Sequence, residues 1–181
     1  MNGMNRLVVA STICINLAVL LGMVDGIYYH LWKYRLFGRS ESRFEHVLHT
    51  VRAFLFLPIF WLLYGENYGG WALWLGVFFV AADSIVELID VLIERRSRAD
   101  IGGLSTGEYA IHVNATALRL AALALIFAAK PVEAWSLTAP LVLSPSYPSW
   151  VNWFALNSVP AGLIGVLAHL WLMREKYRVT A

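Results

Sequence analysis

Five long apolar stretches alternate along the chain with short polar segments. The stretches are residues 7–30, 47–64, 71–93, 109–129 and 151–173. A helix needs about 20 apolar residues to cross the ~30 Å hydrocarbon core of a bilayer, and each stretch is close to that length. The pattern therefore predicts an all-α, polytopic membrane protein with about five transmembrane helices and no room for a soluble domain.

Composition and charge support a membrane location and indicate an orientation. Hydrophobic residues make up 59% of the 181 residues, against about 45–50% in soluble domains. Lysine and arginine gather after the first, third and fifth stretches: Lys33, Arg35, Arg39 and Arg43; Arg95, Arg96 and Arg98; Arg174, Lys176 and Arg178. The positive-inside rule then predicts an outer N-terminus and a cytoplasmic C-terminus, in a bacterial inner membrane or its equivalent. Basic residues at the membrane surface argue against a nucleic-acid partner.

A polar motif occurs twice, at the start of the second and of the fourth stretch. It reads S-x-x-E-x-x-x-H over residues 42–49 and again over residues 105–112. Each copy follows a stretch with acids near its end, Asp25 before the first copy and Asp83 with Glu87 before the second. The first four stretches therefore predict a duplicated helical hairpin.

The repeat organises the chain as a single transmembrane domain. We expect repeat A over residues 7–64, repeat B over 71–129, an outer loop over 130–150, an additional helix over 151–173 and a cytoplasmic tail over 174–181. The outer loop is expected to rest on the membrane surface or to cap the bundle. A pseudo-twofold axis should relate the two repeats, with Glu45 facing Glu108 and His49 facing His112.

The repeated motif puts a carboxylate beside an imidazole on each of two helices. Residues four apart share a helical face, so Glu45 lies next to His49, and Glu108 next to His112. The candidate metal ligands are these residues and the acids of the preceding stretches: Asp25, Glu45, His49, Asp83, Glu87, Glu108 and His112. Further polar residues near the same level are supporting residues or alternative ligands: His30, His46, Asp90, Arg119 and His169. Burying so many acids without a cation is costly, and a bound metal ion would remove that cost.

The candidate set amounts to four carboxylates and two histidines if one of Asp83 and Glu87 binds. It resembles the di-iron and di-manganese carboxylate proteins, four-helix bundles in which two helices contribute one Glu each and the other two contribute a Glu–His pair. The resemblance covers spans one to four. It departs in spacing, because Glu and His are four residues apart here and three in those proteins. It implies a centre of one or two divalent ions, with iron favoured over zinc or manganese.

The motif also has a simpler explanation. Its S-x-x-E part is a capping box, in which Ser42 and Ser105 would cap their helices and the glutamates would reach back to the cap amides. His49 and His112 would then be hydrogen-bonded packing residues. The histidines outside the repeat would be interfacial or would support the ligands. Capping does not account for the buried acids of the third stretch.

The third stretch carries an acidic stripe on one helical face: Asp83, Glu87, Asp90 and Glu94. Its last two acids are expected to be solvated or paired with Arg95 and Arg98. Arg119 lies near the middle of the fourth stretch, where an unpaired charge is costly, so we expect it to pair with Asp83. Glu87 would then be the metal ligand of the third stretch.

Three classes of function are compatible with these residues. A membrane metalloenzyme would catalyse oxygen-dependent oxidation of a membrane lipid or another apolar small molecule, with hydrolysis as an open alternative. A proton or metal-ion transporter would use the acidic stripe as a relay. A b-type haem protein would use two histidines as axial ligands. Haem leaves the acids unexplained, and the outer halves of the stretches lack the charges that a transport path needs, so the metalloenzyme is the first expectation.

Overall fold

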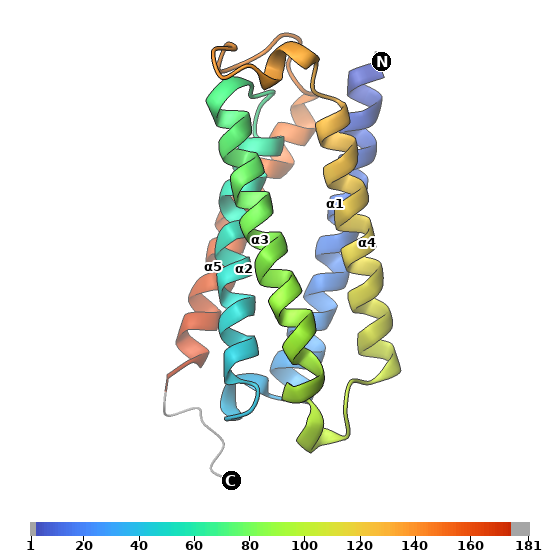
Figure 1. Cartoon of the computed structure of the whole chain (residues 1–181), viewed down its shortest axis with the longest axis vertical. Coiled ribbons are helices and arrows are strands. Elements are labelled where there is room, and N and C mark those ends of the chain that lie inside the picture. Colours follow the sequence, from blue (N-terminus) through green and yellow to red (C-terminus); the bar gives the residue numbers. More distant parts are fainter. Residues whose placement is uncertain (1–2, 175–181) are drawn as a thin grey trace.

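The computed structural model describes residues 3–174, which form an elongated bundle of five long helices (Figure 1). The long helices are α1 Gly3–Met23, α2 Arg43–Tyr64, α3 Gly70–Ser97, α4 Thr106–Ala128 and α5 Ser149–Leu172. The short ones are η1 Val24–Lys33, which continues α1, η2 Leu36–Gly38, η3 Ala99–Ile101 and η4 Val132–Trp135. The described residues contain no β-strand, so the all-α prediction is confirmed. Residues 175–181, most of the predicted cytoplasmic tail, lie outside the described residues.

Within the described residues, four helices are long and apolar enough to cross a membrane: α1 with η1, α2, α4 and α5. The remaining predicted span, α3, buries the carboxylates Asp83, Glu87, Asp90 and Glu94. Its other side consists of large apolar side chains, because Ile85, Leu88 and Leu92 are 60%, 59% and 72% exposed. The polarity of α3 is therefore the reverse of that of a surface helix in water, which buries its apolar face.

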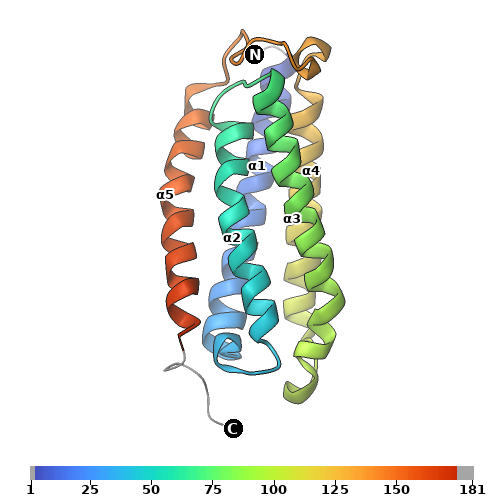
Figure 2. The same ribbon diagram turned by 60° about the vertical axis from the view of Figure 1, so that its left-hand side comes forward.

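The helices pack in an order that differs from their order along the chain. α1 packs against α4, while α2 packs against both α3 and α5 (Figure 2). The predicted repeats consist of α1 with α2 and of α3 with α4. The helices within each repeat are therefore not the ones that pack most closely. A twofold axis that exchanged α1 with α3 and α2 with α4 would map the α1–α4 contact onto the α3–α2 contact. The packing is compatible with the predicted duplication, which stays a prediction.

The two ends of the bundle differ. The capped end holds the N-terminus and the segment 130–148, which lies across the ends of the helices (Figure 1). This segment is tied to the α2–α3 loop, because Gly69 N–H donates to Leu141 O at 3.1 Å and Leu143 N–H donates to Asn67 O at 2.9 Å. The basic end holds the loops 34–42 and 98–105, which follow η1 and α3.

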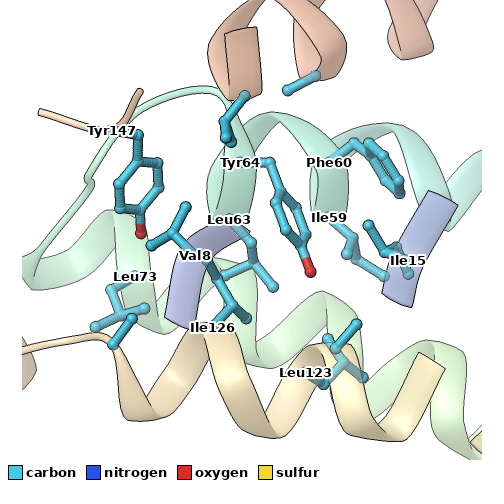
Figure 3. Packing of buried hydrophobic residues seen from close by; sticks show 14 of the residues in the cluster. Val8, Ile15, Ile59, Phe60, Leu63, Tyr64, Leu73, Leu123, Ile126 and Tyr147 are labelled. Carbon is cyan, nitrogen blue, oxygen red and sulfur yellow. The ribbon is translucent and has the colours of Figure 1, made fainter. Parts of the chain in front are cut away.

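A hydrophobic core fills the half of the bundle next to the capped end (Figure 3). Val8 on α1 and Ile126 on α4 are fully buried there. The Tyr64 hydroxyl lies 2.7 Å from Ser11 Oγ, which donates to Ala122 O at 2.7 Å. Apolar packing therefore holds this half together, and the buried carboxylates and histidines lie toward the basic end.

Candidate metal centre

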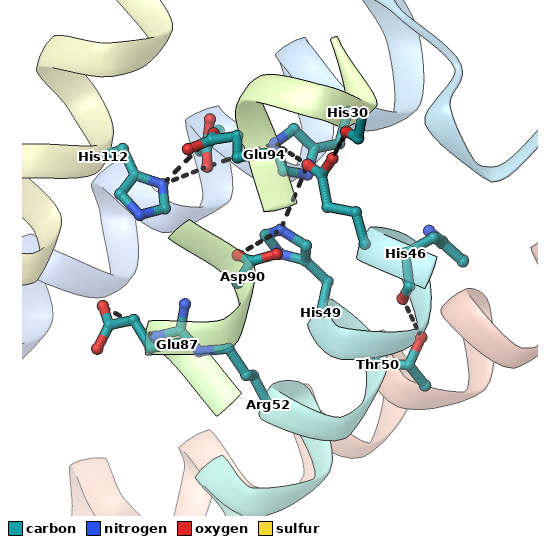
Figure 4. A network of polar contacts seen from close by, with 12 residues as sticks. His30, His46, His49, Thr50, Arg52, Glu87, Asp90, Glu94 and His112 are labelled. Atoms are coloured by element: carbon teal, nitrogen blue, oxygen red, sulfur yellow. Dashed lines mark hydrogen bonds and ion pairs between the residues drawn. The ribbon is translucent and has the colours of Figure 1, made fainter. Parts of the chain in front are cut away.

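Carboxylates and imidazoles from four helical segments converge inside the bundle near the basic end (Figure 4). We call the following residues the ligand cluster: Asp25 and His30 on η1, Glu45 and His49 on α2, Asp90 and Glu94 on α3, and Glu108 and His112 on α4. Two groups in this cluster could hold a metal ion, because the ligand atoms of each lie within 4.8 Å of one another. The groups are His30, Glu45 and His49, and Asp25, His30 and Glu108.

The repeated motif supplies two of the three most deeply buried carboxylates of the cluster. Glu45 and Glu108 are 1% and 0% exposed, and both face the interior. Ser105 Oγ accepts the Glu108 N–H at 3.3 Å and so caps α4. Ser42 makes no such cap, because its hydroxyl donates to Ser97 O at 3.0 Å. The glutamate carboxylates bind other partners than the cap amides, so a capping box does not explain them.

The segment η1 places two polar residues that are five apart on one face. Its backbone is π-helical, with hydrogen bonds from residue i to i+5, and such turns are frequent at functional sites. Both Asp25 and His30 are therefore buried, with His30 Nε2 3.6 Å from Asp25 Oδ2. The same nitrogen lies 3.6 Å from Glu108 Oε1 and 3.9 Å from Glu45 Oε1. His30, expected to support the ligands or to be an alternative ligand, is common to both candidate groups.

On α3, the cluster contains the acids nearest the basic end. Asp90 Oδ2 lies 3.2 Å from His49 Nε2, and Glu94 Oε1 lies 4.0 Å from His112 Nδ1. Of the two alternatives expected for Glu94, solvation or pairing with Arg95 and Arg98, solvation is wrong, because Glu94 is 7% exposed. The physical reason is that α3 ends where α2 begins, so the end of α3 is level with Glu45. Asp83 is about 16 Å from Glu94 along the helix and lies at another level.

Asp83 and Glu87 take part instead in a separate cluster, the ion-pair quartet, which they form with Arg52 and Arg119. Arg119 Nη1 donates to Asp83 Oδ2 at 2.8 Å, so the predicted pairing of these two residues is confirmed. Arg119 also binds Glu87 through Nη2, and Arg52 lies 3.1 Å from Asp83 Oδ1 and 3.3 Å from Glu87 Oε1. Glu87 was expected to be the metal ligand of the third stretch. That expectation is wrong, because both arginines pair with its carboxylate. Neither acid belongs to the two candidate groups.

Arg98 lies between two carboxylates of the ligand cluster, a position that the sequence did not indicate. The sequence places it among the basic residues after the third stretch, as a possible partner of Asp90 and Glu94, yet its side chain is 0% exposed. Its guanidinium donates to Glu45 Oε2 at 2.5 Å and to Glu108 Oε1 at 2.8 Å. Burial lowers the pKa of Arg98, but these hydrogen bonds and the two negative charges outweigh burial and raise it above its usual value. No signal in the sequence distinguishes Arg98 from its exposed neighbours Arg95 and Arg96.

Several ligand atoms of the cluster are buried without a hydrogen-bond partner. They are Asp25 Oδ1, Glu45 Oε1, Asp90 Oδ1, Glu108 Oε2 and His112 Nε2. A buried polar atom left in this way costs about 1–3 kcal/mol, so native proteins usually provide a partner. Carboxylate oxygens and imidazole nitrogens are the ligands that divalent transition metals accept. The residues therefore fit a metal centre, and bound cations would supply the missing partners.

The two remaining histidines lie outside the cluster, between α2 and α5. The rings of His46 and His169 stack with centroids 4.8 Å apart, and His46 Nε2 lies 3.2 Å from His169 O. In the cluster, His30 and His49 meet edge to face at 4.4 Å. Rings in such contact leave no space for a porphyrin between them, so neither pair suits axial ligation of haem.

Comparisons of the chain with protein-family models, with curated proteins and with solved structures found no match. The likeness of the ligand cluster to a metal site therefore stands on its residues and geometry alone.

Proposed function

We propose that this chain is an integral membrane metalloprotein whose ligand cluster binds two divalent ions. The observation that carries the proposal is the set of buried, unpartnered ligand atoms on four helical segments. The net charge of the buried side chains supports the number of two ions. The cluster contains five carboxylates, and the guanidinium of Arg98 offsets one of them. Four negative charges remain if all five are ionised, which two divalent cations would neutralise, and buried charge without such balance is costly.

The distribution of polarity on α3 supports a membrane location. A helix that exposes Leu88 and Leu92 while burying Asp90 and Glu94 suits a hydrocarbon environment. In our proposal the basic end faces the cytoplasm, because the loops there carry the excess of arginine. The metal centre would then lie in the cytoplasmic half of the membrane.

We propose further that the centre is an enzyme site, with iron as the preferred metal and a membrane lipid or another apolar molecule as substrate. Mixed oxygen and nitrogen ligands suit iron, manganese or zinc. Bound iron would supply redox chemistry with oxygen. The chain's own residues would hold the ligands in place: Asp90 Oδ2, 3.2 Å from His49 Nε2, orients that imidazole, and Glu94 with Asp25 flanks Nδ1 of His112 at 4.0 and 3.9 Å.

Metal analysis of the purified protein tests the proposal. Protein reconstituted with Fe²⁺ in detergent should contain about two ions per chain, as measured by mass spectrometry. His112→Ala and the double variant Glu45→Gln/Glu108→Gln should lose metal while circular dichroism reports unchanged helicity. The matched control is Glu133→Gln, which changes an exposed acid at the capped end. The absence of stoichiometric iron, manganese or zinc after reconstitution would refute the proposal.

A transporter is the second candidate, because α3 buries four acids in succession on one face. Against it, the half of the bundle next to the capped end has an apolar core and no acid on the continuation of that stripe within Gly70–Ala82. Proteoliposomes distinguish the two candidates. Passage of protons or Mn²⁺ at rates above those of empty vesicles would favour transport, whereas oxygen consumption with iron, an electron donor and membrane lipid would favour the enzyme.

A further inference from the structure

We propose that Arg98 is a positioning residue of the metal centre, which turns one oxygen of Glu45 and one of Glu108 toward the metal ions. This inference rests on the proposed function and deepens it. It assigns a role to a cation that touches no metal itself. It also explains why the glutamate of both copies of the motif is buried next to the same guanidinium.

Each glutamate uses one oxygen for Arg98 and keeps the other free. Arg98 Nη1 donates to Glu45 Oε2 at 2.5 Å, while Glu45 Oε1 has no hydrogen-bond partner. Arg98 Nε and Nη2 donate to Glu108 Oε1 at 3.2 and 2.8 Å, while Glu108 Oε2 has no partner. One guanidinium therefore fixes two carboxylates that come from different helices. Their free oxygens remain available as ligands.

The surroundings hold the guanidinium itself in place. Ser97 Oγ accepts from Arg98 Nη1 at 2.9 Å and donates to Glu45 Oε2. On the other side, Nη2 lies 3.2 Å from Nε2 of His30, a residue common to both candidate groups. Arg98 thus orients two carboxylates of the ligand cluster and also contacts His30.

Arginine is suited to this role where lysine is not. Its planar fork can donate to two carboxylates at once, whereas an ammonium group is a compact point charge. A lysine at position 98 would keep the charge but could not bridge Glu45 and Glu108 in the same geometry. Residues that orient metal ligands typically change metal affinity about 10–100-fold when they are mutated. The conservative variant Arg98→Lys therefore separates positioning from charge.

Cobalt(II) binding tests the inference with a spectroscopic readout. We would titrate Co²⁺ into the full chain in nanodiscs and record its visible absorption, which depends on ligand geometry. Arg98→Lys should weaken Co²⁺ binding about 10–100-fold and change the absorption bands. The control is Arg96→Lys, an exposed arginine on the same turn, which should bind like the wild type. Wild-type affinity and bands in Arg98→Lys would overturn the inference.

A second variant covers the case in which Arg98→Lys fails to fold. Ser97→Ala removes one hydroxyl that holds both Arg98 and Glu45, and it should change the cobalt bands in the same direction by a smaller amount. Unchanged bands in Ser97→Ala would count against the inference. If the wild-type protein binds neither cobalt nor iron, the proposed metal centre itself is wrong, which is a different outcome from a failure of Arg98 to position its ligands.

Discussion

At the scale of residues, two charged clusters lie next to each other in the bundle and differ in balance. The ion-pair quartet matches two guanidiniums with two carboxylates, and Thr116 donates to Glu87 Oε1 at 2.8 Å. The ligand cluster has one guanidinium for five carboxylates. Buried charges are stable only when they are paired or bind metal. The quartet is therefore balanced in itself, whereas the carboxylates of the ligand cluster outnumber the guanidinium beside them.

The first prediction concerns the quartet. Arg119→Leu would leave Asp83 and Glu87 with Arg52 alone. Breaking a buried ion pair costs about 3–5 kcal/mol, so we expect a large decrease in the free energy of unfolding, reduced by what Arg52 still offsets. The measurement is unfolding by sodium dodecyl sulfate in mixed micelles. The double variant Arg119→Leu/Asp83→Asn should recover part of the loss, and equal stability of the two variants would contradict the pairing.

At the scale of elements, the long helices could be predicted because the hydrophobic effect sets their length. The stretch 109–129, for example, became α4, Thr106–Ala128. The level of the ligands on α3 could not be predicted in this way. α3 has 28 residues against 22 in α2, so its far end reaches the level of the motif. Asp90 and Glu94 consequently take the places that the sequence suggested for Asp83 and Glu87.

Two further features depend on tertiary contacts that no pattern along the chain records. Asp25 and His30 are five residues apart, a spacing that an α-helix would place on different faces and that the π-helical backbone of η1 brings together. Arg98 turns inward because two glutamates from other helices attract it. Its sequence neighbours Arg95 and Arg96 are exposed. The hydrophobic and polar pattern of the sequence does not distinguish Arg98 from these two arginines.

The second prediction concerns the contact between α2 and α3, which sets Glu45 and His49 against the acids of α3. A Cβ added to Gly76 would lie 2.9 Å from Leu63 Cδ2. Gly76→Val should therefore separate the helices and cost about 1–3 kcal/mol through overpacking, and it should lower metal content as well. Gly165→Val is the control, because the added Cβ would meet no described atom within 4 Å apart from its chain neighbours and the backbone of its own helix. Equal thermal stability of the two variants would show that the helices do not approach as closely as described.

At the scale of the whole molecule, the capped end carries a buried lysine. Lys130 Nζ donates to Asn67 Oδ1 at 3.0 Å and to Tyr68 O at 2.8 Å, and it lies 4.9 Å from the centroid of the Tyr147 ring. Burial lowers the pKa of Lys130 from 10.5 to about 7, although Glu66 opposes the shift. A neutral amine still has the N–H groups for both hydrogen bonds. The lysine therefore ties the segment 130–148 to the bundle most favourably when it is uncharged.

The third prediction gives the sign of the resulting pH dependence. Between pH 7 and pH 10.5 the unfolded chain binds a proton on Lys130 that the folded chain largely lacks. Stability should therefore rise with pH across this window, and the full cost of burying the charge should apply below it. Lys130→Met should flatten the profile of melting temperature between pH 7 and pH 9. A slope equal to that of the wild type would mean that Lys130 is not the titrating group.

The last prediction links the proposed metal centre to the stability of the bundle. The ligand cluster joins η1, α2, α3 and α4, so ions bound there should stabilise the folded state over the unfolded one. At a free concentration 100 times the dissociation constant, a ligand of one site contributes about 2.7 kcal/mol. We therefore expect Mn²⁺ to raise the melting temperature of the reconstituted protein at neutral pH. Histidine must be unprotonated to bind metal, so the increase should shrink as pH falls below about 6.5.

Glu45→Gln/Glu108→Gln should show no increase in melting temperature with Mn²⁺ at neutral or at lower pH, because it removes two of the ligand carboxylates while keeping the side-chain volume. An equal increase in this variant would place the manganese outside the ligand cluster.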